Sequence, residues 1–91
     1  MTQLLCTIKM TKTDNSELRV GEFVLDVASD PSFSSSDYQR VAMKHVRDNA
    51  DQFGYEIDRS NGIVYFGATS LKLEDFQALT VEINQINYAT A

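Results

Sequence analysis

The segment that most constrains the fold is YEIDRSNGIVYFG, residues 55–67, in which β-forming residues flank an Asn-Gly pair. Asn61 and Gly62 favour the positive φ angles of a type I′ turn, which joins two antiparallel strands. With these two residues as the loop, Ile57 pairs opposite Phe66. The hairpin then has two distinct faces, one formed by Tyr55, Ile57, Val64 and Phe66 and the other by Ile63 and Tyr65.

Two further strands are expected in the first third of the chain. Residues 3–12, QLLCTIKMTK, alternate with the period of two that is typical of a half-buried strand. Residues 17–28 form a second strand, whose apolar positions change phase at Gly21. A β-bulge or a sharp bend at this glycine restores the inward face. The inward side chains of the first strand are Leu4, Cys6, Ile8 and Met10.

Two helices complete the predicted elements. The first follows a loop at residues 29–36, begins at Ser36 with a capping box to Gln39, and ends at Gly54. The second runs from about Leu71 to the end of the chain, because apolar residues recur there at helical spacing. Its inward stripe consists of Leu73, Phe76, Leu79, Ile83 and Ile86.

The order of elements is therefore ββαββα. A chain of 91 residues is the size of one domain, so residues 1–91 are expected to share a single core. The predicted fold class is α+β, with one four-stranded antiparallel sheet and both helices packed on one face. The pattern leaves the strand order open.

Composition restricts the classes of function. The formal net charge is −5, and a negative surface repels phosphate, which disfavours nucleic acid as a partner. The single cysteine excludes an internal disulfide, and neither a metal-ligand set nor a cofactor motif is present. No apolar run reaches the length of a membrane span and no signal peptide is visible, so no membrane association and a cytoplasmic location are expected.

Few residues have the chemistry of an active site. Cys6 and His45 are the one nucleophile and base of the usual kind, but Cys6 lies among apolar residues, where a thiol acts as a small hydrophobe. We therefore expect no enzyme. His45 and Asn49 fall on the apolar face of the first helix and must find hydrogen-bond partners. They either bond at the edge of the core or line a small ligand pocket.

The other face of this helix carries a basic stripe, formed by Arg40, Lys44 and Arg47. Such a stripe can contact phosphate or an acidic protein. Lys44 with Asp48, and Arg47 with Asp51, are also spaced as intrahelical ion pairs, which are typical of a solvated helix face. We prefer the second interpretation.

Outward apolar residues give the remaining functional signal. On the last predicted helix, Ala78, Val81 and Tyr88 lie away from the inward stripe, and no charged side chain follows Glu82. The second predicted patch, on the outer face of the sheet, contains Ile63 and Tyr65. A contiguous apolar patch is typical of a contact surface.

These features predict a small, non-enzymatic protein-binding module that associates with itself as a homodimer or with another protein. A specific version is an accessory or inhibitor protein of the kind that phages direct against a host protein. One alternative is a small-molecule or nucleotide-binding domain with its pocket near His45 and Asn49. Another is a weak nucleic-acid binder that uses Arg40, Lys44 and Arg47.

Overall fold

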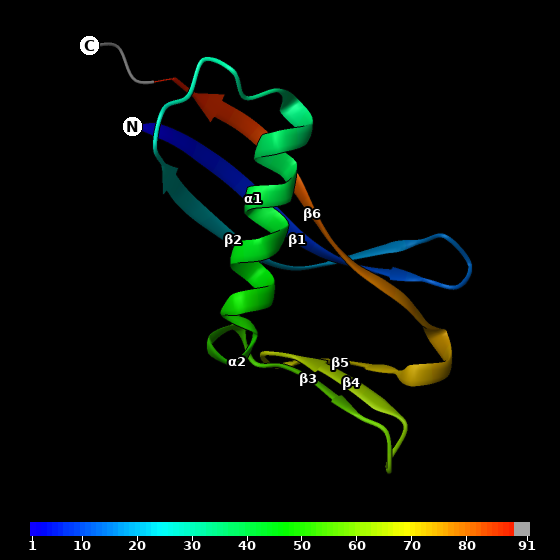
Figure 1. Ribbon diagram of the computed structural model, residues 1–91. Coiled ribbons are helices and arrows are strands. Elements are labelled where there is room, and N and C mark those ends of the chain that lie inside the picture. The colour runs from blue at the N-terminus through cyan, green and yellow to red at the C-terminus, as the bar shows by residue number, and fades with distance from the viewer. Residues whose placement is uncertain (89–91) are drawn as a thin grey trace.

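The computed structural model describes residues 1–88 of the chain (Figure 1). In chain order its elements are β1 (Thr2–Lys12), β2 (Glu17–Val27), α1 (Ser35–Asp48), α2 (Ala50–Phe53), β3 (Tyr55–Asp58), β4 (Ile63–Phe66), β5 (Thr69–Lys72), the 3-10 turn η1 (Leu73–Asp75) and β6 (Phe76–Asn87).

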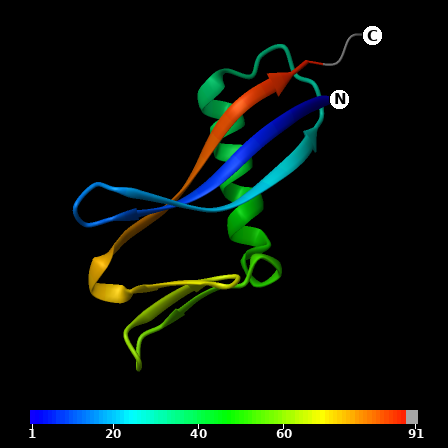
Figure 2. The same ribbon diagram turned by 180° about the vertical axis from the view of Figure 1, so that it is seen from behind.

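The strands form two separate antiparallel sheets. Sheet A has the strand order β2-β1-β6, and sheet B is the meander β3-β4-β5. α1 lies across one face of sheet A, and sheet B lies beyond the C-terminal end of α1 (Figure 1). Seen from behind, the opposite face of sheet A has no element of residues 1–88 across it (Figure 2). The predicted fold class, one four-stranded sheet with two helices on one face, is therefore wrong.

The largest correction concerns the C-terminal helix, because most of that segment is the strand β6. β6 pairs antiparallel with β1, and two register shifts leave Gln77 and Asn84 as extra residues. Each bulge reverses the phase of the alternation. The side chains that pack on the core are consequently Phe76, Leu79, Val81, Ile83 and Ile86. When Val81 is left out, this series has the spacing of three and four residues that also marks a helix.

β1 supplies the centre of the core. Its predicted alternation is confirmed, because Leu4, Cys6, Ile8 and Met10 are all buried. Side chains from α1 and sheet B pack in the same buried cluster, so one core connects the two sheets. These partners are Tyr38, Ala42, Val46, Val64 and Phe66.

The bulge predicted at Gly21 is also confirmed. Ile8 pairs with Gly21 and Lys9 pairs with Arg19, so Val20 is the extra residue of β2. A Cβ atom at Gly21 would lie 3.3 Å from the ring of Phe66. The glycine therefore lets sheet B approach sheet A closely at this point.

The hairpin of residues 55–66 forms, but its predicted register is wrong by two residues. Ile57 pairs with Val64, so the loop comprises residues 59–62. Gly62 has a positive φ of 65°, whereas Asn61 does not, so the turn is not type I′. The Asp58 carboxylate stabilises the longer loop by accepting hydrogen bonds from the Asn61 backbone amide (3.1 Å) and side chain (2.8 Å). The predicted inward face is kept, with Val64 buried.

α1 begins two residues before the predicted position and uses a different cap. Ser34, rather than Ser36, is the N-cap, and it forms a reciprocal capping box with Asp37. Gln39, the predicted box partner, instead donates a hydrogen bond to the backbone carbonyl of Val81 on β6. α1 ends at Asp48, and the short α2 ends at Phe53. Gly54, the predicted end of the helix, is the C-cap of α2 and has the left-handed conformation.

Candidate functional site

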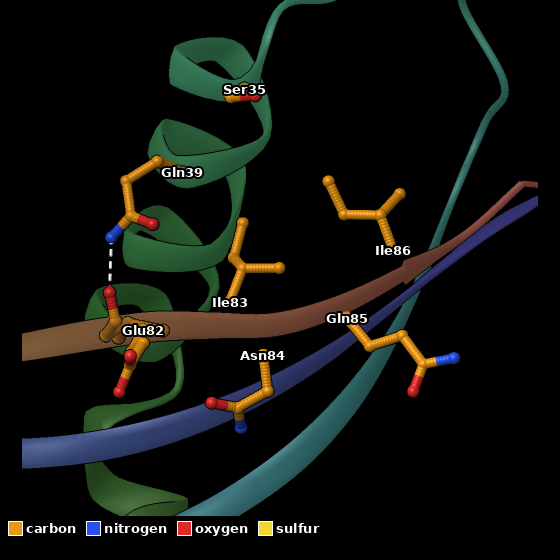
Figure 3. Close-up of a pocket in the computed structure, with 8 residues that line it drawn as sticks. Ser35, Gln39, Glu82, Ile83, Asn84, Gln85 and Ile86 are labelled. Atoms are coloured by element: carbon orange, nitrogen blue, oxygen red, sulfur yellow. Dashed lines mark hydrogen bonds between the residues drawn. The ribbon is translucent and has the colours of Figure 1, made fainter.

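The most distinctive surface is the edge of β6 that does not face β1. An open groove of about 570 Å³ runs along this edge beneath the first half of α1. Figure 3 shows that Ile83 and Ile86 point to the side of the sheet on which α1 lies, while Glu82, Asn84 and Gln85 point away. The residues that line the groove are Ser35, Gln39, Val81, Glu82, Ile83, Asn84, Gln85 and Ile86.

The backbone of β6 presents hydrogen-bonding groups along this edge. The Val81 carbonyl is directed away from β1 and accepts the hydrogen bond from Gln39. Because alternate residues of an antiparallel strand face opposite neighbours, Ile83 also directs its N–H and C=O to the open edge. The bulge at Asn84 shifts this alternation by one residue, so Ile86 is the next residue that faces outward. Residues 82–87 therefore form an open edge, which we call the β6 edge.

The β6 edge is electrically neutral. Its one charged side chain, Glu82, lies 2.5 Å from the Lys9 ammonium, and Lys9 also lies 3.3 Å from Glu17. The hydrogen bond from Lys9 and its positive charge lower the pKa of Glu82 below its ordinary value. Glu82 therefore stays ionised together with its cation, and residues 83–87 contain no charged side chain.

Amide side chains make the outer side of the β6 edge polar. Asn84 donates to the hydroxyl of Thr7 on β1 at 2.6 Å, and Gln85 donates to Asn87 at 2.6 Å. Thr7 is fully buried although it lies on the outer face of sheet A, because Asn84 and Arg19 cover it. These bonds hold the amides close to the strand and leave its backbone edge open.

The predicted interface residues do not form the expected pattern. Val81 is only 4% exposed and belongs to the core, so its predicted outward orientation is wrong. That orientation depended on a helix, and the strand turns the same residue inward. Tyr88 is 67% exposed. Ala78 lines a pocket between α1 and sheet B, while Ile63 and Tyr65 lie half-buried on β4. The structure thus separates these five residues rather than joining them in one patch.

Tyr88 stands beside a small aromatic cluster. Its ring centroid is 6.3 Å from that of Tyr38, which in turn lies 5.4 Å from Phe33, and both pairs meet edge to face. The three rings border a hollow of about 340 Å³ near Thr2 and Asp30. Tyr88 directly follows β6, so the cluster anchors one end of the β6 edge.

His45 and Asn49 satisfy one another instead of pointing into a cavity. The Asn49 side-chain amide donates to the His45 carbonyl at 2.8 Å and lies 3.4 Å from His45 Nδ1. The imidazole ring packs at 5.0 Å from the ring of Phe23 and 6.1 Å from that of Phe53. Neither residue lines the groove beneath α1, the hollow beside Tyr88 or the pocket that contains Ala78. Their arrangement is that of polar groups bonded at the edge of the core.

The basic stripe on α1 is partly neutralised. Arg40 lies 2.6 Å from Asp37 and Lys44 lies 3.1 Å from Asp48. Arg47 forms no ion pair with any residue between 1 and 88, so the expected pair with Asp51 is absent there.

Arg47 instead lines a second pocket, of about 290 Å³, at the junction of α1, β3 and β6. Most of its walls are apolar, and this pocket was not foreseen because it needs β6 as a strand. Its other lining residues are Met43, Val46, Ala50, Tyr55, Phe76, Ala78 and Leu79.

The groups with catalytic chemistry are not assembled into a site. Cys6 is 3% exposed, and burial raises the pKa of its thiol to about 11, which disfavours the nucleophilic thiolate. Across residues 1–88, no three metal-ligand side chains lie together. The described helices are also too short or too polar to cross a membrane.

Comparisons with known proteins add no assignment. No protein-family model, curated protein or solved structure matches the chain. The sequence signal that could have indicated β6 as a strand was the β-branched content of residues 80–86.

Proposed function

We propose that the chain is a small, non-enzymatic protein–protein interaction module that binds another polypeptide by adding a strand to the β6 edge. The observation that carries this proposal is the combination of unpaired backbone groups and missing charge along residues 83–87. An exposed edge of this kind is a template for pairing with another chain. The accessory or inhibitor role against a host protein is a specific case of the same activity.

The groove beneath α1 supports the proposal. It gives an added strand room beside β6, and its apolar side offers Ile83 and Ile86, which are half-buried. In strand addition, main-chain hydrogen bonds supply affinity and neighbouring side chains supply specificity. The β6 edge has both kinds of group.

A pair of matched variants tests this function. Gln85 on β6 and Val24 on β2 both pair with Leu5 of β1, so they lie on the same rung at opposite edges of sheet A. The tagged wild type, Gln85→Lys and Val24→Lys are expressed in the native host, cross-linked and purified. A polypeptide, including an untagged copy of this chain, should be captured by the wild type and by Val24→Lys but be depleted with Gln85→Lys. Equal capture by all three proteins contradicts the proposal.

A second candidate function rests on the pocket beside Arg47. Its apolar walls and the guanidinium of Arg47, which has no ion pair within residues 1–88, suit a small apolar carboxylate, although a volume of about 290 Å³ is at the lower limit for ligand sites. Octanoate should raise the melting temperature of the wild type and have less effect on Arg47→Gln, because a ligand of the native state stabilises it. No shift with octanoate removes this candidate.

A further inference from the structure

We propose that the polypeptide added at the β6 edge is a second copy of this chain, bound antiparallel so that β6 pairs with β6. A two-fold axis perpendicular to sheet A then passes between Asn84 and Gln85. The two copies form one six-stranded sheet with both α1 helices on the same face. This inference rests on the proposed function and names its partner.

The backbone pattern sets the register of the pair. The Val81 carbonyl is already bonded to Gln39, so pairing begins at residue 82. Ile83 and Ile86 are the outward-facing residues, and the two-fold axis brings Ile83 of one copy opposite Ile86 of the other. In each such pair the two residues form N–H···O=C hydrogen bonds with one another, using backbone groups that are otherwise left to water.

The bulge at Asn84 is the feature that favours a second copy over an unrelated strand. A regular strand can pair at this point only by placing one residue opposite both Asn84 and Gln85, as β1 does with Leu5 on the other side of β6. A second β6 has the same extra residue at the same place, and the two-fold axis superimposes the two irregularities. The bulge, which usually disrupts pairing, is thus compatible with this partner.

Side chains across the axis are also compatible. Asn84 lies opposite Gln85 of the other copy, and both are neutral amides that donate and accept hydrogen bonds. Glu82 lies opposite Asn87, and its charge is balanced by Lys9 within its own chain. No like charges face one another, although each copy has a net charge of −5.

Sedimentation equilibrium of the purified chain tests the inference. The wild type should show a concentration-dependent dimer, and Gln85→Lys should raise its dissociation constant at least about tenfold, because two ammonium groups meet near the axis. Val24→Lys, with the same change in charge at the other edge, should keep the wild-type constant. Circular dichroism confirms that each variant is folded.

Amide hydrogen exchange gives a second readout that does not depend on a substitution. The N–H groups of Ile83 and Ile86 should become more protected as the wild-type concentration rises, whereas that of Val24 should not. A monomer at every concentration, or a dimer that Gln85→Lys leaves intact without protection at these amides, overturns the inference. If the monomer still captures another protein in a manner lost with Gln85→Lys, the proposed function stands and only its partner is wrong.

Discussion

The two edges of sheet A differ in the charged side chains that they present to an approaching strand. β2 and β6 both pair with β1 and leave one row of backbone groups open. On β2 the outward-facing residues include Glu22, Val24 and Asp26, because their partners on β1 direct their own backbone groups toward β6. Two β2 strands paired about Val24 would place Glu22 against Asp26, and this like-charge contact is destabilising.

β6 has no charged side chain between residues 83 and 87, so no like-charge contact opposes pairing there. Charged residues on an edge strand are a common means of preventing association. The acidic residues of the chain are therefore unevenly distributed: the β2 edge carries two carboxylates between residues 22 and 26, of which Glu22 pairs with Arg19 at 3.4 Å, whereas residues 83–87 of β6 carry none. The following predictions test that difference.

The largest expected effect is the difference in stability between a substitution at a core position of β6 and one at an exposed position of β2. Val81→Asp should lower the free energy of unfolding by about 4 kcal/mol, because it places a carboxylate in the core. Val24 is 59% exposed, so Val24→Asp should change the same quantity by less than about 0.5 kcal/mol. Urea denaturation followed by circular dichroism measures both. A stable Val81→Asp variant would contradict the packing of β6.

Val81 also shows where prediction from sequence failed. The spacing of Leu79, Ile83 and Ile86 fits a helix, and two bulges in β6 produce that spacing in a strand. Bulges depend on pairing with β1, a contact far along the chain, so a local pattern cannot reveal them. By contrast, β1 has no bulge of its own in the regular alternation of Leu4 to Met10, and its burial was predicted correctly.

The hairpin and the functional surface illustrate the same limit. A hairpin at Asn61 and Gly62 was predictable from local chemistry, but its register depends on Asp58, whose carboxylate stabilises a longer loop. The β-branched residues between positions 80 and 86 could have indicated a strand, but not that it lies at an edge, because an edge is defined by which strands lack a second neighbour. The missing charge after Glu82 was also visible, and it was assigned to a helix.

Replacing two carboxylates on β2 should reduce the difference between the two edges. Glu22→Gln with Asp26→Asn removes both carboxylates that flank Val24, so pairing becomes open to both sides of the sheet. We expect species larger than a dimer in light scattering, with an association constant for this second contact raised about tenfold over that of the wild type. Glu56→Gln with Glu74→Gln is the control, since it removes the same charge outside sheet A. Equal growth of both double variants would attribute association to net charge alone.

A smaller effect concerns the bulge that bends β2. Gly21→Ala should lower the free energy of unfolding by about 1 kcal/mol, because the new Cβ meets the Phe66 ring at 3.3 Å. Phe66→Leu in the same chain should relieve part of this cost, which thermal or urea denaturation of the double-mutant cycle measures. Additive losses in the double variant would show that the two residues are not in contact.

The smallest expected effect concerns the one charge on the β6 edge. The hydrogen bond from Lys9, with its positive charge, lowers the pKa of Glu82 below 4.5, so Lys9→Met should raise that pKa toward 4.5 in an NMR titration of the carboxyl carbon. Lys72→Met, which alters a cation on sheet B, should leave it unchanged. A group with a lowered pKa in the folded state stabilises the fold above pH 4.5, and this contribution is lost as the pH falls through its folded value. Wild-type stability should therefore decline more steeply than that of Lys9→Met below pH 4.5, and parallel declines would show that Lys9 does not neutralise the β6 edge.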